Sequence, residues 1–183
     1  YRQLQNTLLL QSVAGRAHIE KAWMDLPYGV TVRLFVDGDI DSIETLEFVF
    51  RLCEQRPDLQ PYSYSKSWKI FLQYAQTGKS FPTNYTLNLS SGSIYGDAIK
   101  EKMLALPITR GTFEAFQIDG YKVMPDKQDR VAWLAYSKAL KAKAGYQKSF
   151  VCPGKCYSCL PLKSHACGSS ARFKGIPVLI NVH

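Results

Sequence analysis

The chain alternates between short apolar runs rich in β-branched residues and longer segments whose apolar residues recur every three or four positions. The first pattern is typical of buried strands, and the second is typical of helices with one face in the core. The expected strands are 29–36, 59–65, 85–89, 112–118 and 178–182, and the expected helices are 2–24, a segment between 41 and 57, 68–77, 97–106 and 127–144. Strand, turn and helix follow one another at least three times, which predicts parallel strands with right-handed crossovers. We therefore expect an α/β protein of repeated βα units, either an open parallel sheet or a partial barrel.

Small and polar residues lie at the ends of the first three expected strands and in the loops that follow them. They are Asp37, Gly38 and Asp39, then Ser65, Lys66 and Ser67, and finally Asn88, Ser90, Ser91, Gly92 and Ser93. The carboxyl ends of parallel strands share one edge of a sheet or barrel, and ligands bind there. The sequence thus predicts a ligand-binding rim, in which the cation Lys66 would meet a carboxylate or phosphate. Helix capping explains part of this composition, because Ser and Asp are preferred N-caps.

Four of the five cysteines lie within sixteen positions, with the spacing C-x3-C-x2-C-x7-C. They are Cys152, Cys156, Cys159 and Cys167. Four closely spaced thiolates indicate an iron–sulfur centre, which is our leading interpretation, in the form of a 4Fe-4S cluster. The alternative is a tetrahedral zinc ion, for which C-x2-C is the usual half-site and His165 or His183 a possible further ligand. Paired disulfides are more typical of small secreted domains.

The fifth cysteine, Cys53, has a different setting. It continues a helical spacing of apolar residues that includes Leu46 and Val49. A small apolar side chain at such a position belongs to a core, so we expect Cys53 to be a packing residue rather than a ligand.

The positive charge is concentrated near the carboxyl end. The 183-residue chain has a net charge of +8, and no acidic residue follows Asp129. A one-signed segment beside a metal motif predicts contact with nucleic acid. The candidate residues are Lys138, Lys141, Lys143, Lys148, Lys155, Lys163, Arg172 and Lys174. In the alternative interpretation these side chains only solubilise a helix and balance the charge of a cluster.

Length and composition limit the organisation and location of the protein. With 46% hydrophobic residues, the chain suits one domain or one domain with an appendage. We expect an α/β domain over 1–125, and over 126–183 a basic helix, the cysteine-rich metal-binding segment and a final strand. No run approaches the length of a membrane span, and no signal peptide pattern opens the chain. These features predict an intracellular, cytoplasmic protein that does not enter a membrane.

The usual catalytic motifs do not occur in the sequence. It contains no Walker loop, no G-x-G-x-x-G and no H-E-x-x-H, and it shows no clear carboxylate dyad or nucleophile–histidine pair. Substrate, reaction and oligomeric state therefore stay open, as does the question of whether the protein is an enzyme. The first residue is Tyr1, and the first 24 residues have the pattern of a helix already under way, so we expect the natural protein to extend upstream.

Three stretches together resemble a family of phage and plasmid proteins, the gene product 88-like family. They are Val32-Arg33-Leu34-Phe35-Val36-Asp37-Gly38-Asp39, Tyr62-Ser63-Tyr64-Ser65-Lys66-Ser67 and Leu87-Asn88-Leu89-Ser90-Ser91-Gly92-Ser93. Members also close with a cysteine-rich segment before a terminal histidine. An additional cysteine motif in that family precedes the point where this sequence begins. The resemblance therefore implies a truncated chain or a member that has lost the motif, and a host-cell location.

A looser similarity is to radical S-adenosylmethionine enzymes, which share a partial barrel, a small acidic motif after a strand and a C-x3-C-x2-C sequence. Here the cysteines are C-terminal, and Ser158 stands where an aromatic residue is usual. This similarity implies that 37–39 would hold the methionine amino group of S-adenosylmethionine and that the cysteines would bind an auxiliary cluster.

We therefore expect a radical SAM-like iron–sulfur protein of a phage or plasmid that acts on or near nucleic acid. The alternative is a non-enzymatic, zinc-stabilised basic protein of a mobile element. Such a protein would dock on nucleic acid or on a host protein complex.

Overall fold

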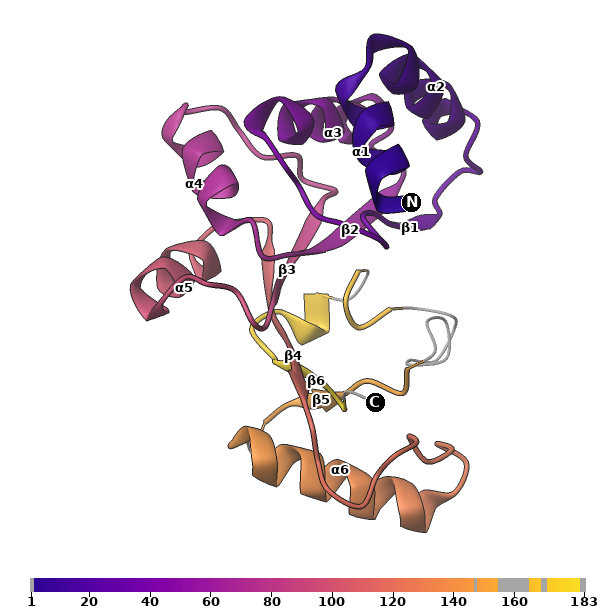
Figure 1. The fold of residues 1–183 in the computed structure, drawn as a ribbon, viewed down its shortest axis with the longest axis vertical. Helices are drawn as coiled ribbons and strands as arrows, with labels where there is room; N and C mark the ends of the chain where they lie inside the picture. The colour runs from indigo at the N-terminus through magenta and orange to yellow at the C-terminus, as the bar shows by residue number, and fades with distance from the viewer. Residues whose placement is uncertain (1, 147, 155–164, 169–170, 182–183) are drawn as a thin grey trace.

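The computed structural model describes residues 2–146, 148–154, 165–168 and 171–181 (Figure 1). Its elements in chain order are α1 (Arg2–Gln11), α2 (Val13–Met24), β1 (Thr31–Arg33), α3 (Ile43–Gln55), β2 (Gln60–Ser65), α4 (Trp68–Gln76), β3 (Thr86–Ser90), α5 (Asp97–Leu104), β4 (Thr109–Phe116), α6 (Arg130–Ala144), β5 (Phe150–Val151), the 3-10 helix η2 (Ala171–Phe173) and β6 (Val178–Asn181). None of these helices combines the length and apolar character that a membrane span requires.

The strands form one six-stranded sheet in the order β1-β2-β3-β4-β6-β5, and every neighbouring pair is parallel. This confirms the predicted α/β fold with an open parallel sheet, which has the shape of a half-barrel. Strands β4 and β6 are neighbours, so the sheet is continuous across the expected domain boundary near residue 125.

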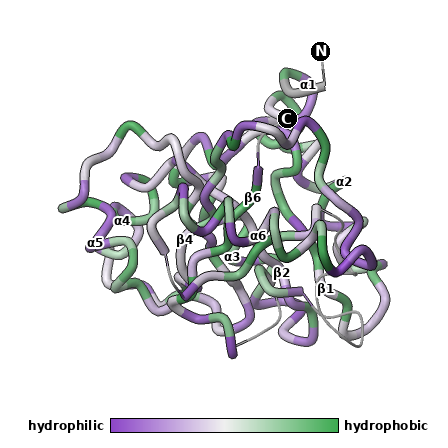
Figure 2. The backbone as a smooth tube through the Cα atoms, turned by 90° about the horizontal axis from the view of Figure 1, so that it is seen from below, coloured by the Kyte–Doolittle hydropathy of each residue, from purple (hydrophilic) through white to green (hydrophobic). Residues whose placement is uncertain are grey.

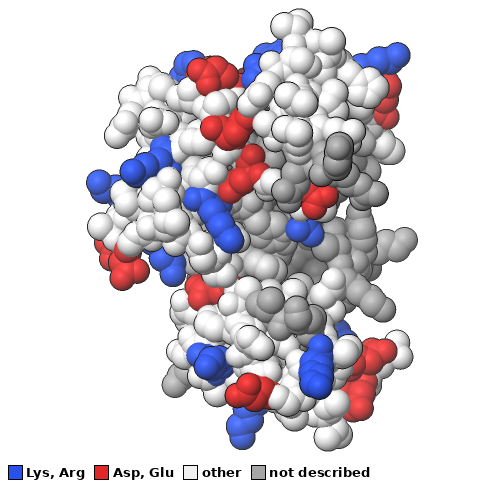
Figure 3. Space-filling view, in the orientation of Figure 1, with Lys and Arg blue, Asp and Glu red and all other residues white. Residues whose placement is uncertain are grey.

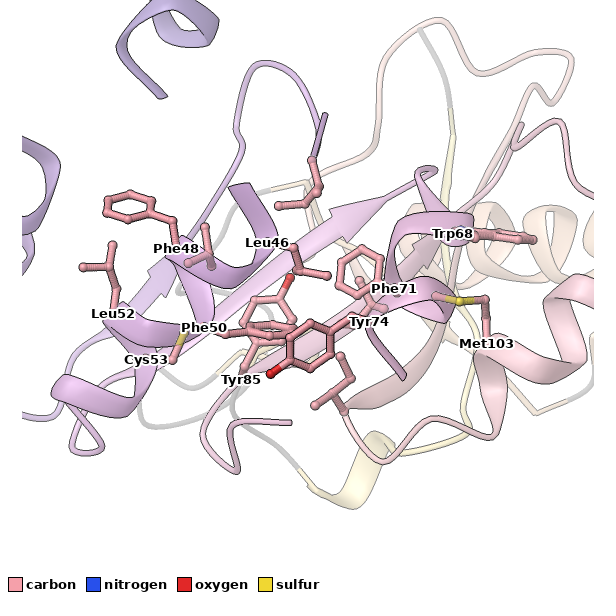
Figure 4. Packing of buried hydrophobic residues seen from close by; sticks show 14 of the residues in the cluster. Leu46, Phe48, Phe50, Leu52, Cys53, Trp68, Phe71, Tyr74, Tyr85 and Met103 are labelled. Atoms are coloured by element: carbon pink, nitrogen blue, oxygen red, sulfur yellow. The ribbon is translucent and has the colours of Figure 1, made fainter. Parts of the chain in front are cut away.

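Helices α3, α4 and α5 cover one face of the sheet, which we call the outer face. Side chains alternate between the two faces of a strand, and Leu87 and Leu89 of β3 enter the core beneath these helices. Phe50 of α3 is 2% exposed, and its ring centroid lies 4.9 Å from that of Tyr74 and 5.2 Å from that of Tyr85 (Figure 4). Burying one such ring contributes roughly 1.5–3 kcal/mol, so this aromatic group anchors the helices on the sheet.

Helix α6 covers the other end of the same outer face. Its buried Tyr136 and Leu140 pack with Val151 of β5 and Leu179 of β6. Seen from the α6 side, the helix crosses in front of the sheet and carries both hydrophobic and hydrophilic positions (Figure 2). An amphipathic helix of this kind buries one stripe and leaves the rest of its surface to solvent.

The described part of the connection between β5 and β6 lies on the opposite face, which we call the inner face. Strands β1 to β4 step across the sheet in one direction, whereas β6 returns to a place between β4 and β5. A right-handed crossover that steps backwards must pass on the face opposite to the other crossovers. The described residues of this connection, 152–154, 165–168 and 171–177, which include Cys152 and Cys167, therefore belong to the inner face, and Figure 1 shows them in the middle of the molecule.

Several boundaries differ from the prediction. The single helix expected over 2–24 is two helices, because Ser12 caps α2 by accepting a hydrogen bond from Gly15 N (3.0 Å). A Cβ at Gly15 would collide with the backbone of Leu9, so the glycine permits the close approach of α1. Strand β4 begins at Thr109, three residues earlier than expected, and the two-residue β5 was not expected.

Candidate functional site

The inner face brings together two of the four clustered cysteines. Cys167 lies on the inner face in a buried group with Tyr62 of β2 and Val178 of β6. Cys152, which directly follows β5, packs against the same group. Cys156 and Cys159 lie outside the described residues. Within the described part of the chain, no group of three or more His, Cys, Asp or Glu side chains is arranged to hold a metal ion.

The backbone around Cys152 has the geometry of a sulfur-binding turn. Gly154 N donates a hydrogen bond to Cys152 Sγ at 3.4 Å, and Gly154 has a φ of +75° that favours glycine. Hydrogen bonds to cysteine sulfurs are among the features that tune iron–sulfur clusters. The Cys152 sulfur thus accepts a backbone hydrogen bond from within its own turn.

A buried cation, Arg110 of β4, lies near Cys167. Arg110 is 5% exposed, and Nε donates to Asn88 Oδ1 at 2.5 Å. Its Nη1 donates to the carbonyl oxygens of Phe173 (3.1 Å) and Ile176 (2.7 Å), and its Nη2 donates to Thr112 O (2.8 Å). Arg110 thus ties β3 and β4 to the segment that precedes β6.

The charge of Arg110 is not balanced by a carboxylate among the described residues, whose ion pairs involve other side chains. Burial lowers the pKa of Arg110, whereas the charges of Cys167 and Tyr64 act in the opposite direction. A buried charge is costly unless an opposite charge or good hydrogen bonds compensate it. Among the described residues, the ionisable groups that act on Arg110 are thus a thiol and a phenol rather than a carboxylate.

Aromatic side chains surround this polar group. The ring centroid of Tyr64 lies 4.6 Å from that of Phe113 and 5.9 Å from that of Tyr62, and the Arg33 guanidinium lies 4.9 Å from the Tyr64 ring centroid. Burial raises the pKa of Tyr64, with smaller contributions from Cys167. His165 is buried beside Tyr62, and burial lowers its pKa, which favours the neutral imidazole that binds metals.

The three loops of the expected rim lie together at the carboxyl ends of β1, β2 and β3. Asp39 Oδ2 accepts hydrogen bonds from Lys66 N (2.6 Å) and Ser67 N (3.2 Å), and Ser93 Oγ donates to Lys66 O (3.4 Å). A Cβ at Gly92 would lie 3.6 Å from Lys66 Nζ. The Asp39 carboxylate therefore binds the backbone at the start of α4, where a helix favours negative charge.

The other expected rim residues have separate settings. Asp37 and Gly38 are exposed, and Asp37 borders an apolar pocket of about 380 Å³ between the first two helices and α3. Ser65 is buried, whereas Ser90 and Ser91 are half-buried. Asn88 lies inside the protein rather than on the rim: it is 0% exposed and its Nδ2 donates to Ser63 O (3.1 Å) and Cys167 O (2.9 Å).

The basic candidates lie on several elements. Lys138 and Lys143 on α6 are exposed and Lys141 is half-buried; beyond α6, Lys148, Arg172 and Lys174 are exposed, and Lys155 and Lys163 lie outside the described residues. On the face seen in Figure 3, basic groups over the lower part of the molecule alternate with acidic groups. Lys141 and Lys143 lie in the last turn of α6, where positive charge stabilises a helix.

Sequence analysis missed Arg110 as a site residue because the strand was expected to begin at Thr112. The signal is present in Ile108-Thr109-Arg110-Gly111, which continues the β-branched pattern towards the amino end. An arginine inside a buried strand is unusual and marks a polar interior.

These features define a class of protein, an open parallel α/β half-barrel with a cysteine-bearing crossover on its inner face. The family model described as Gene product 88 matches residues 5–174. The chain therefore belongs to the Gene product 88 family, which confirms the resemblance seen in the loops after the first three strands. No curated protein and no solved structure matches the chain significantly.

Proposed function

We propose that this Gene product 88 protein is an iron–sulfur protein whose 4Fe-4S cluster is bound by Cys152, Cys156, Cys159 and Cys167 on the inner face of the half-barrel. One observation carries the proposal. The first and last cysteines of the motif, fifteen positions apart, pack against one buried group beside Arg110, a buried cation that pairs with no carboxylate among the described residues. Four thiolates give a cluster negative charge, and a buried arginine is able to balance it.

The chain's own residues would shape the properties of this centre. Arg110 supplies fixed positive charge near Cys167, and Gly154 N donates to Cys152 Sγ. Tyr62, which is 1% exposed, helps to keep water from the inner face. Such a cluster would supply one-electron transfer, and full cysteine ligation would leave no iron for S-adenosylmethionine. In a radical SAM-like protein it would therefore be the auxiliary centre.

The proposal is tested by anaerobic purification followed by iron, acid-labile sulfide and zinc analysis. We expect a brown protein with near-equal iron and sulfide, bleached by dithionite. Cys156→Ser should lose most of the iron, whereas Cys53→Ala should keep it, because Cys53 lies in the outer-face core and is 0% exposed. A protein that contains neither iron nor zinc would contradict a metal centre of any kind.

The second candidate is a zinc-stabilised binding protein. The observation that favours it is His165, a buried imidazole two positions before Cys167 that supplies a common zinc ligand. A colourless protein with one equivalent of zinc, lost in a His165→Ala variant, would replace the iron–sulfur proposal with this one.

We further propose nucleic acid as the partner, on the basis of the exposed Lys138 and Lys143 and the one-signed sequence after Asp129. Binding to a mixed-sequence oligonucleotide should weaken steeply between 50 and 200 mM salt, because phosphate contacts release counterions. Replacing Lys138 and Lys143 by Gln should reduce the salt slope, and the control Lys21→Gln on α2 should not. Binding that ignores salt, or no binding, would refute this partner.

A further inference from the structure

A small pocket lies on the outer side of the sheet, at the carboxyl ends of β3 and β4. Its volume is about 190 Å³, and its lining includes Trp68, Leu89, Tyr95, Lys100, Thr112 and Glu114. Drug-sized ligand sites begin at roughly 300 Å³, so this pocket fits one small molecule. The pocket is on the face opposite to Cys152 and Cys167, and none of its lining residues belongs to the buried group around those two cysteines.

Thr112 lines this pocket and has a buried hydroxyl. The residue is 7% exposed, and Oγ1 has no hydrogen-bond partner within the described part of the protein. Buried hydroxyls usually have a hydrogen-bond partner, as in Thr109 on the same strand, whose Oγ1 donates to Met103 O at 2.7 Å. A buried polar group that lacks a partner is rare in a folded protein and calls for a physical explanation, such as a missing ligand.

The pocket also contains both signs of charge. Lys100 Nζ lies 3.7 Å from Glu114 Oε1, which is too long for a hydrogen bond, and their side chains are 32% and 12% exposed. Glu114 Oε1 accepts a hydrogen bond from the Tyr146 hydroxyl at 2.9 Å. The ammonium and the carboxylate are therefore near one another but not joined by a hydrogen bond, so each has capacity for a ligand.

These groups restrict the chemical class of the ligand. Glu114 and Asp97 both line the pocket and would repel a multiply charged anion such as phosphate, whereas Lys100 would repel a simple cation. A zwitterion satisfies both signs. The walls formed by Trp68 and Tyr95 favour an apolar portion beside the charged groups.

We propose that this pocket binds the α-amino acid group of a small ligand. The ligand carboxylate binds Lys100 Nζ and the Thr112 hydroxyl, and its ammonium binds the Glu114 carboxylate. The ligand side chain lies against Trp68 and Tyr95. The pocket volume suits a free amino acid, and the serine loop 90–93 forms part of the rim through which the ligand enters.

Calorimetric titration of the full chain with each of the twenty standard L-amino acids tests the proposal. We expect saturable binding of at least one amino acid with an apolar side chain. If leucine binds, then 4-methylpentanoate, which lacks the ammonium, and 3-methylbutylamine, which lacks the carboxylate, should each bind at least tenfold more weakly. Binding of inorganic phosphate in place of amino acids, equal binding of the single-charge analogues, or no binding by any of the twenty would overturn the proposal.

Two variants separate ligand binding from stability. Thr112→Val removes the hydroxyl with little change of shape, so the ligand-free melting temperature should stay the same or rise, while the affinity should fall at least tenfold. Ser137→Ala on α6 is the matched control, because Ser137 Oγ is also buried without a partner within the described residues but lies outside the pocket. It should leave the affinity unchanged. A Thr112→Val protein that binds the ligand as the wild type does would refute the role of the hydroxyl and with it the proposal.

Discussion

Replacing Arg110 by Lys preserves the buried charge but removes the planar fork of donors. The four acceptors of the guanidinium belong to Asn88, Thr112, Phe173 and Ile176. A lysine ammonium is a single point with three donors, so at least two of these acceptors would lose their hydrogen bonds. A hydrogen bond to a charged group contributes about 1.5–3 kcal/mol, so the expected loss of stability is about 3–6 kcal/mol. The free energy of unfolding of a typical domain is about 5–15 kcal/mol in total, so this loss of stability is large.

Urea unfolding, followed by circular dichroism and tryptophan fluorescence, measures this loss. Arg33→Lys is the matched control, because it replaces an arginine by a lysine on the same inner face. Arg33 is exposed, and its guanidinium lies 4.9 Å from the Tyr64 ring centroid. Its expected cost is about 0.5–1 kcal/mol. An Arg110→Lys protein as stable as Arg33→Lys would refute the hydrogen-bonding role assigned to Arg110.

The same position also tests the electrostatic part of the functional proposal. Arg110→Gln removes the charge as well as the fork, whereas Arg110→Lys keeps the charge. If a cluster on the inner face depends on that charge, iron per folded protein should fall in Arg110→Gln and persist in Arg110→Lys. Equal iron content in the two variants would show that charge balance at this position is not needed for metal binding.

Two further changes probe other parts of the fold. In Gly168→Ala the new Cβ would lie 2.5–3.0 Å from ring atoms of Tyr62, which is 1% exposed. Urea unfolding should therefore show a loss of about 1–3 kcal/mol in the free energy of unfolding. In the control Gly96→Ala the new Cβ would have no neighbour within 4 Å, so its stability should be nearly unchanged. The Arg56 guanidinium, bound to both Asp58 carboxylate oxygens at 2.8 Å, holds the pKa of Asp58 below its usual range. That stabilisation is present above pH ~4 and is lost as the pH falls through the lowered pKa, so acid should destabilise the wild type more steeply than Asp58→Asn, and parallel pH profiles would contradict this.

Periodicity was sufficient to predict the helices that cover the outer face. Leu46, Val49, Phe50 and Cys53 recur at helical spacing, and all four are buried in the outer-face core. Such patterns are reliable because a helix that packs on a sheet must bury one stripe of its surface. The meeting of the three rim loops was also predictable, since parallel strands end at one edge.

The capping residues show where local patterns were less informative. Asp41 and Asp126 have side chains that suit an N-cap, but Ser42 caps α3 and Asp129 caps α6, each by accepting a hydrogen bond from a backbone N–H in the first turn. Several adjacent residues have side chains that suit the same role, and tertiary packing decides which turn begins the helix.

The inner face was harder to predict because its contacts are long-range. Strand β5 has only two residues, Phe150 and Val151, too few for a periodic signal. The position of β6 between β4 and β5 depends on the whole sheet. Without knowledge of the strand order, the sequence does not reveal that Asn88 Nδ2 donates a hydrogen bond to Cys167 O, 79 positions later in the chain.

Strand order has a direct consequence for function, because it separates the two candidate sites. The forward crossovers place α5 and Lys100 on the outer face, where they meet Thr112 of β4. The backward step from β5 to β6 places Cys167 on the inner face, where it lies near Arg110 of the same strand β4. Arg110 and Thr112 are only two positions apart, and Arg110 Nη2 donates to Thr112 O at 2.8 Å. A ligand that orders the outer pocket therefore acts on the same stretch of backbone that supports the inner-face cation. Binding at one site should consequently be measurable at the other as a change in stability or in metal retention.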